Sequence, residues 1–453
     1  MDTESKKEKF FLLDPRLASA KALTEWEKRG ATLDLVLSEI LPQVRKENRP
    51  FFLEITKGVI RNLLFLDYKL EKILNRSLSS LLPDLKNLLR VSAYQLEFMH
   101  IPKPVVVDIA VELSKKIGHP GIVKLVNAGL RKLAEGVALE LPSDPVERLS
   151  LVYSHPSWMV KRWISRFGIQ DTETLLQWNN TIPLLEVRVN RMRVTPEAFV
   201  DIGRHHGVPM QASPFEEAFS LEPSGPVEKL PGYAEGFFWI QSFSALFPAL
   251  LLNPKPGEKI LDLCSAPAGK ACQMAEMTED KAEILAVDNN PERLKKVEEN
   301  RRRLGFTSIH PLLADGRECG RLFPRWADAV LVDAPCTATG ALRRKPDARW
   351  RRKPSDLPEY VKLQEELLES AALAVKPGGR IVYATCSLEL EENEGIVEHF
   401  LLTHPKFFLE EPSPYLPKSI LAMNCIQNGF LKILPQVCRM DGFFSARLKR
   451  KHE

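Results

Sequence analysis

Two cysteines of this sequence each follow a short apolar run. Cys386 ends RIVYATC, which is entered through Pro377-Gly378-Gly379, and Cys336 ends the earlier run ADAVLVDAPC. Short runs that are rich in β-branched residues and bounded by turn residues predict buried strands. Because open α/β sheets present reactive groups at the carboxyl ends of their strands, we expect the two thiols to lie together and to take part in chemistry. The alternative is that both cysteines are small packing residues in a core.

Carboxylates also stand at the ends of strand-like runs. Asp288 ends EILAVD, Asp315 follows HPLLA, and Asp333 lies in VLVDAPC. An acidic residue after the second strand suits the two ribose hydroxyls of a nucleoside, and Asp315 is placed to accept from an adenine amino group. The loop Cys264–Lys270 consists of small residues, which let a backbone approach a ligand closely. Because it lacks the spacing of a phosphate-cradling loop, and GxGxxG is absent too, the expected ligand is an adenosine without phosphates, which points to S-adenosylmethionine.

The elements that position these groups fall into three parts. Strand and helix patterns alternate from about residue 231 onward, which predicts a parallel, doubly wound α/β sheet. The first 140 residues or so predict an all-α bundle, with a helix start at Asp14-Pro15 and a stop at Gly30. Between them lies a linker followed by a small α/β unit of the β-α-β type. We therefore expect a multidomain chain with domains at 1–140, 141–230 and 231–453.

Composition excludes several classes of protein. The chain of 453 residues is 44% hydrophobic and 27% charged, as in globular proteins, and its net charge of +4 permits local nucleic-acid binding without demanding it. The N-terminus lacks an apolar signal core, and the most apolar run, residues 237–252, is too short to span a bilayer. The seven cysteines show no CxxC spacing, which argues against zinc and against a disulfide framework. We expect a reduced, cytoplasmic monomer without a metal.

Ordered motifs in the second half of the chain resemble those of the RNA cytosine carbon-5 methyltransferases, in particular their Fmu/Sun branch. They are DLCSAPAGK, VDNNPERL, ADGR, VDAPCTATG, GGRIVYATCSLELEENE and DGFFSARLK. The helical part, about residues 10–138, resembles the RNA-binding NusB fold through EITKGVIRNLLFLDYKLEKIL and LLRVSAYQLEFMHIP. The resemblance implies a NusB-like bundle, a Rossmann-like methyltransferase domain and small-subunit ribosomal RNA as the substrate. It also implies a set of cofactor contacts: Cys264, Ser265, Ala266, Pro267, Ala268, Gly269, Lys270, Asp288, Asp315 and Asp333.

The resemblance further implies that Cys386 is the nucleophile. Carbon 5 of cytosine reacts with a methyl donor once a thiolate has added to carbon 6. Asp333 then orients the base, and Cys336 assists release of the product, either as a base or as a helper. In DNA cytosine methyltransferases a Pro-Cys motif supplies the nucleophile instead, which would be Cys336 here. The target base must be unstacked to be reached.

The sequence departs from the family pattern at three places. Ala268 stands where the family usually has glycine, and Thr337-Ala338 replaces a common Ser-Gly. Gln241-Ser242 replaces a common Gln-Asp ahead of the cofactor loop. We expect these changes to affect cofactor affinity more than the type of reaction.

A basic run with one aromatic residue follows the Cys336 motif. Residues 340–353, GALRRKPDARWRRK, place seven basic side chains around one tryptophan with a single opposing aspartate. Such a mixture suits single-stranded RNA, by phosphate contact and stacking. The expected RNA contacts are Arg343, Arg344, Arg349, Trp350 and Arg351.

Two further cationic sets are candidates for RNA contact. Arg188, Arg191 and Arg193 alternate with apolar residues, which on a strand would place them on one exposed face. The helical bundle offers Lys57, Arg61, Lys115, Lys116, Arg131 and Lys132. The alternative is that all of these are ordinary solvated side chains. Two other functions stay open: methylation of transfer RNA or DNA, and a catalytically silent RNA-binding assembly factor.

Overall fold

The computed structural model describes residues 13–136, 138–222 and 225–452. They form two compact units. The first unit contains the chain up to Thr181 together with Lys345–Arg351, and the second contains Ile182–Arg344 and the chain from Arg352 onward. The domain boundaries expected near residues 140 and 230 remain a prediction.

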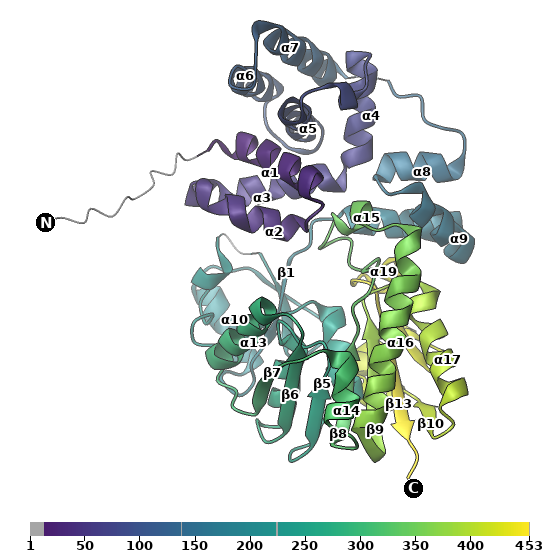
Figure 1. Cartoon of the computed structure of the whole chain (residues 1–453). Helices are drawn as coiled ribbons and strands as arrows, with labels where there is room; N and C mark the ends of the chain where they lie inside the picture. Colours follow the sequence, from purple (N-terminus) through teal and green to yellow (C-terminus); the bar gives the residue numbers. More distant parts are fainter. Residues whose placement is uncertain (1–12, 137, 223–224, 453) are drawn as a thin grey trace, which may run out of the picture. The chain divides into compact units, whose positions relative to one another are not determined.

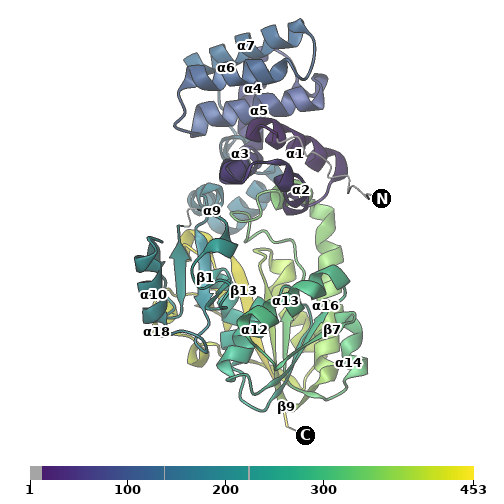
Figure 2. The ribbon, with the colours of Figure 1, turned by 90° about the vertical axis from the view of Figure 1, so that its left-hand side faces the viewer.

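Helices build the first unit, as the sequence predicts (Figures 1 and 2). At the start of α1 the Asp14 carboxylate accepts a hydrogen bond from the Arg16 amide at 2.8 Å. The helix ends at Gly30, whose φ of 59° is the left-handed conformation that favours glycine. The helices are α1 Pro15–Arg29, α2 Leu33–Ile40, α3 Arg49–Arg61, α4 Leu63–Leu74, α5 Pro83–Phe98, α6 Lys103–Ser114, α7 Pro120–Glu135, α8 Pro145–Tyr153, α9 Ser157–Asn180 and the short α15 Ala348–Arg351.

A small antiparallel sheet opens the second unit. Its strands lie in the order β2-β3-β1-β4, and α10 packs on it through Phe199. The order of strand, helix and strand along the chain is the expected one. The neighbouring strands are antiparallel, however: β2 and β3 form a hairpin, and β3 pairs with β1 in the antiparallel direction. The elements are β1 Leu185–Val189, α10 Pro196–His205, β2 Met210–Ala212, β3 Ala218–Leu221 and β4 Phe238–Ile240.

A larger mixed sheet forms the centre of the second unit. Its order is β11-β12-β13-β9-β8-β5-β6-β7, and β10 also pairs with β13. The segment from β9 to β7 is parallel, as expected, whereas the strands beyond β9 are antiparallel. The strands are β5 Lys259–Asp262, β6 Glu283–Asp288, β7 Ile309–Leu313, β8 Ala327–Asp333, β9 Val375–Thr385, β10 Phe407–Glu410, β11 Ile426–Gln427, β12 Phe430–Ile433 and β13 Phe443–Arg450.

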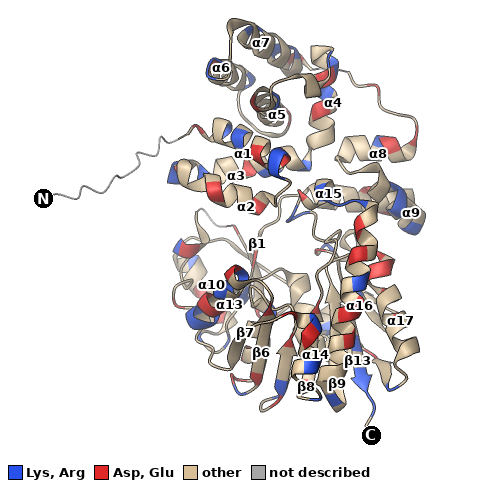
Figure 3. Cartoon of the chain, viewed as in Figure 1, with Lys and Arg blue, Asp and Glu red and all other residues tan. Residues whose placement is uncertain are grey.

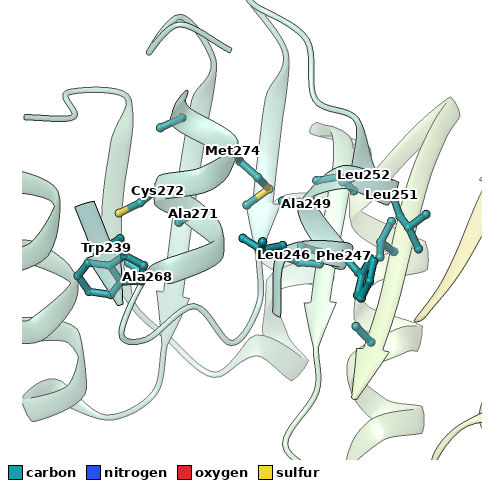
Figure 4. Close-up of a cluster of buried hydrophobic side chains, with 14 of the residues drawn as sticks. Trp239, Leu246, Phe247, Ala249, Leu251, Leu252, Ala268, Ala271, Cys272 and Met274 are labelled. Atoms are coloured by element: carbon teal, nitrogen blue, oxygen red, sulfur yellow. The ribbon is translucent and has the colours of Figure 1, made fainter. Parts of the chain in front are cut away.

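Successive residues of the central strands pack into two separate hydrophobic cores. Ile260 and Leu331 face the cluster formed with α11, α12 and α13, whose packing Figure 4 shows in part. Their neighbours Leu261 and Val330 face the cluster formed with α14, α16 and α17. Figure 1 shows α16 running along β8 and β9. These helices are α11 Phe247–Leu252, α12 Gly269–Met277, α13 Pro291–Leu304, α14 Cys319–Leu322, α16 Leu357–Ala374 and α17 Glu394–Thr403, with the short α18 Lys418–Leu421 and α19 Pro435–Cys438 nearer the C-terminus.

The order of the strands locates a crevice. β5 has β6 on one side and β8 on the other, so the chain reverses direction across the sheet at β5. Ligands of open α/β sheets bind at the carboxyl ends of the strands at such a point. Among the described residues, no helix is long and apolar enough to cross a membrane.

Candidate active site

The two thiols lie side by side beyond the carboxyl ends of β8 and β9. These strands are parallel neighbours, with Asp333 opposite Ala384, so the residues that follow them enter one region. The Sγ atoms of Cys336 and Cys386 are 3.3 Å apart. The contact with Cys386, together with burial, raises the pKa of the Cys336 thiol well above its ordinary value. Cys336 therefore carries its proton at neutral pH.

A lysine–carboxylate pair lies at the same edge of the sheet. Lys270, in the first turn of α12, donates from Nζ to Oδ2 of Asp333 at 2.5 Å. Burial opposes the charge of Lys270, but Asp333, followed by Asp262 and Cys386, outweighs burial and raises the pKa of Lys270. A cation held near a cysteine is the setting in which thiolates act as nucleophiles.

Asp262 is a residue of this site that the sequence reasoning did not single out. It ends β5, its side chain is buried, and it borders the same small cavity as Lys270 and Asp333. Burial raises the pKa of Asp262 to about 7, and the nearby charge of Asp333 adds to the effect. The signal that identified Asp288 and Asp315, an acidic residue at the end of a strand, would have found it.

The expected cofactor residues border two cavities that share Cys264. A cavity of about 760 Å³ is lined by Asp288 and Asp315 and by Glu359 and Glu366 of α16. Figure 3 shows that α16 carries several acidic positions. Asp288 accepts a hydrogen bond from the amide of Asn290 at 3.0 Å. Hydrogen bonds from Arg317 lower the pKa of Asp315. Both carboxylates therefore face a space large enough for a nucleoside.

The second cavity is smaller, about 180 Å³. It is lined by Asp262, by the Lys270–Asp333 pair and by Gln241-Ser242, the dipeptide that departs from the family pattern. Most of the cofactor loop borders it: Cys264, Ser265, Ala266, Pro267 and Gly269. Ala268 is instead fully buried in the apolar cluster of Figure 4.

The two alanines that replace family glycines occupy a backbone conformation that favours glycine. Ala268 has a φ of 79° and Ala338 a φ of 60°. Left-handed backbone costs an L-residue with a Cβ about 1–2 kcal/mol. The departures from the family pattern therefore place strain in the cofactor loop and in the loop that carries Cys336.

The structure contradicts the prediction that Arg343 and Arg344 are available for contact with RNA. Both are held by two carboxylates from distant parts of the chain. Arg343 lies 3.1 Å from Glu186 and 3.3 Å from Asp441, and Arg344 lies 2.5 Å from Glu186 and also pairs with Asp441. These guanidinium groups hold the loop in place within the second unit and do not present charge to a polyanion.

The same correction applies to Arg349 and Trp350, which belong to the first unit. Arg349 is 0% exposed and donates to the main-chain carbonyls of Arg61, Ser154 and Asn179. Trp350 donates from Nε1 to a carbonyl of α3 at 2.8 Å. The neighbouring Arg351, 27% exposed at its side chain, lies 3.5 Å from a carboxylate one helical turn away.

Two other expected RNA contacts are buried. Arg188 is 2% exposed and forms an ion pair with Glu276, which corrects the predicted cationic strand face. Arg191 and Arg193 lie on the turn after β1, outside the strand. Arg61 is also buried, at 5% exposure. RNA contact by the remaining bundle cations stays a prediction: Lys57, Lys115, Lys116, Arg131 and Lys132.

Within the described part of the chain, no cluster of three or more His, Cys, Asp or Glu side chains is arranged to hold a metal ion.

Comparison with known proteins gives matches along almost the whole chain. Residues 249–449 match the family model of the 16S rRNA methyltransferase RsmB/F, residues 13–135 the NusB family, and residues 155–228 the ferredoxin-like domain of RsmF/B-like methyltransferases. The probable ribosomal RNA small subunit methyltransferase B of Bacillus subtilis is 33% identical over 439 residues, covering 95% of this chain and 97% of that protein. The ribosomal RNA small subunit methyltransferase B of Salmonella dublin is 34% identical over 445 residues, covering 96% and 98%. The crystal structure of PH0851 has a TM-score of 0.80 at 28% identity and covers 97% of this chain and 99% of that one.

Proposed function

Because the chain belongs to the RsmB/F family of 16S rRNA methyltransferases, we propose that it moves a methyl group from S-adenosylmethionine to carbon 5 of a cytosine in small-subunit ribosomal RNA. The observation that carries this proposal is the thiol pair, with Sγ atoms 3.3 Å apart, at the sheet edge that also holds Lys270 and Asp333. Two thiols in contact suit a reaction in which one attacks a base and is later expelled. In this proposal the enzyme acts in the cytoplasm, where its thiols stay reduced. It acts there as a monomer.

The residues present fit an S-adenosylmethionine ligand. Asp288 and Asp315 face the large cavity with the carboxylates that ribose hydroxyls and an adenine amino group require. Cys264 borders both cavities, and most of the remaining loop up to Lys270 lines the smaller one beside Asp333. When bound, the cofactor supplies an electrophilic methyl group.

Cys386 is the nucleophile of this proposal. Its thiolate adds to carbon 6 of the cytosine, which forms the sulfur–carbon bond and moves electron density to carbon 5. Asp333 accepts a hydrogen bond from the amino group of the base, and the ammonium group of Lys270 balances the negative charge that develops on the ring. After methyl transfer, the proton on carbon 5 leaves to a base, and the sulfur–carbon bond breaks with its electron pair returning to Cys386.

Cys336 assists that last step. Its raised pKa keeps it protonated, so its S–H group can donate a hydrogen bond to the departing Cys386 thiolate. This role differs from that of a base, which needs the deprotonated form of Cys336.

Separate replacement of the two thiols tests the assignment. We expect Cys386→Ala to lower methyl transfer by about three orders of magnitude or more. Cys336→Ala should instead accumulate a denaturant-resistant adduct between enzyme and RNA, visible on a denaturing gel in the presence of S-adenosylmethionine. Full activity of Cys386→Ala together with an inactive Cys336→Ala would assign the attack to Cys336. Bisulfite sequencing of small-subunit RNA made with and without the enzyme identifies the modified cytosine, and unchanged cytosines throughout would reject the substrate.

A further inference from the structure

A buried glutamate joins the two loops that carry the cysteines. Glu392 is 0% exposed and lies between β9 and α17. Its Oε1 accepts from the Thr337 amide at 2.9 Å, and its Oε2 accepts from the hydroxyl groups of Thr337 and Ser387. Thr337 directly follows Cys336, and Ser387 directly follows Cys386. One carboxylate therefore binds the residue next to each thiol.

The same carboxylate is fixed from a third direction. Nε2 of Gln364, on α16, donates to Oε1 of Glu392 at 2.9 Å and also to the Pro335 carbonyl at 2.9 Å. Cys336 is thus held on both sides, through Pro335 before it and Thr337 after it. Four donors therefore converge on the two oxygens of Glu392.

The main chain of Glu392 is itself anchored to β9. The Tyr383 hydroxyl donates to the Glu392 carbonyl at 2.6 Å. The adjacent Asn393 donates to the Ser387 carbonyl at 3.0 Å and accepts from the Thr385 hydroxyl at 2.5 Å. The loop after Cys386 is therefore bound to a rigid strand at several points, and Glu392 extends that rigidity to the loop after Cys336.

We propose that Glu392 is a positioning residue that holds the Cys336 and Cys386 thiols at their contact distance. The inference rests on the proposed function, in which Cys336 assists the departure of Cys386. Removing the carboxylate takes two hydrogen bonds from Thr337 and one from Ser387. It leaves the 3.1 Å contact between the Thr337 and Ser387 hydroxyl groups as the direct bond between these two side chains, so the thiols separate more often. Catalysis then slows at the step that needs both thiols, because misplacement by a fraction of a bond length lowers rates strongly.

The thiol separation can be measured without the methylation reaction. In a glutathione buffer, the two thiols transfer two electrons to glutathione disulfide, form one Cys336–Cys386 disulfide and release two reduced glutathione molecules. The equilibrium constant of this exchange reports how often the two sulfurs meet. Peptide mass spectrometry of the full-length protein identifies the bond among its other cysteines.

Three variants separate positioning from stability. Glu392→Ala should lower that constant about tenfold or more, and kcat to a similar degree with little change in KM for S-adenosylmethionine. Glu392→Gln should restore most of both, since its amide oxygen serves the two N–H donors and the hydroxyl groups can turn to accept from its NH₂ group. The control Asp328→Asn removes a carboxylate at the other end of β8, where Asp328 accepts from the Lys259 amide and Lys376. It should lower the melting temperature without changing the disulfide constant.

An unchanged disulfide constant in folded Glu392→Ala would overturn the inference, whatever its activity. If Glu392→Ala does not fold, Ser387→Ala removes the Cys386 half of the bridge together with the contacts of the Ser387 hydroxyl with Thr337 and Thr339, and it should lower the constant. No decrease would overturn the inference as well. A lowered constant combined with full activity of Cys386→Ala would leave the positioning role standing and reject the proposed nucleophile.

Discussion

At the scale of single residues, folding disfavours the ionised form of Asp262. Its pKa rises from 3.8 to about 7, chiefly through burial. A group whose pKa is raised by folding stabilises the protein fully below its unfolded pKa and loses that contribution as pH rises through the folded value. Asp262 therefore contributes stability in acid that is lost between about pH 4 and pH 7.

Asp262→Asn should remove this dependence. Between pH 5 and pH 8 we expect the free energy of unfolding of the variant to increase relative to that of the wild type, by a few kcal/mol at most. Each unit of pKa shift corresponds to about 1.4 kcal/mol. Urea unfolding of both proteins at the two pH values measures the change. A difference between the two proteins that is the same at both pH values would contradict the shifted pKa.

The left-handed alanine next to the thiols makes a second prediction. Ala338, with a φ of 60°, pays the conformational cost that glycine avoids, so Ala338→Gly should stabilise the protein by about 1 kcal/mol or less after the lost methyl contacts are counted. Ala341→Gly in the same loop is a matched control, because Ala341 lies outside the left-handed region and should lose stability instead. Thermal unfolding compares the two, and destabilisation by both would show that the methyl group of Ala338 matters more than its backbone.

Strand-end reasoning on the sequence succeeds where one local signal is enough. It places Cys336 and Cys386 together because parallel neighbours share an edge, and the same signal covers Asp262. The prediction of RNA contact from the basic run fails for Arg343 and Arg344, whose carboxylate partners Glu186 and Asp441 lie far away in the sequence. Nothing local to a basic run distinguishes a buried ion pair from a free cation.

At the scale of elements, the buried pair Arg188–Glu276 ties β1 to α12. Glu276→Ala should cost about 3–5 kcal/mol, because it leaves a guanidinium group buried without its carboxylate. The double variant Arg188→Met with Glu276→Leu should be much less destabilised, since no charge is then left buried. Denaturant unfolding compares the two, and equal losses would mean that packing, not the uncompensated charge, dominates.

Element existence is easier to predict than strand direction. A continuous apolar run such as Val330-Leu331-Val332 indicates a strand with two buried faces, and the alternation of such strands with helices predicted the parallel centre of the sheet. The pairing of β13 with β9 is antiparallel, and an apolar run by itself does not determine strand direction. Direction depends on how the chain returns to the sheet, and here the C-terminal segment returns beside β9.

At the scale of the whole molecule, the chain passes through its first unit twice. After the Cys336 loop it enters that unit at Lys345, leaves it after Arg351 and continues into α16. The inserted residues form the short helix α15, whose Arg349 binds carbonyls that belong to α3, to α9 and to the turn before α9. The segment is therefore a structural part of the first unit and not a linker.

Arg349→Met should consequently destabilise the first unit. The substitution keeps an unbranched side chain but leaves the carbonyls of Arg61, Ser154 and Asn179 without this donor, at about 1–3 kcal/mol for each buried group that finds no substitute. Arg351→Met is the control, because a partly exposed ion pair is worth about 1 kcal/mol or less. Hydrogen exchange of the full-length variants measures the protection of the backbone amides in α3 and α9. This protection should fall in Arg349→Met and persist in Arg351→Met. Equal protection in the two variants would mean that the first unit is stable without the contacts of Arg349, and that the inserted segment Lys345–Arg351 adds no stability to it through this residue.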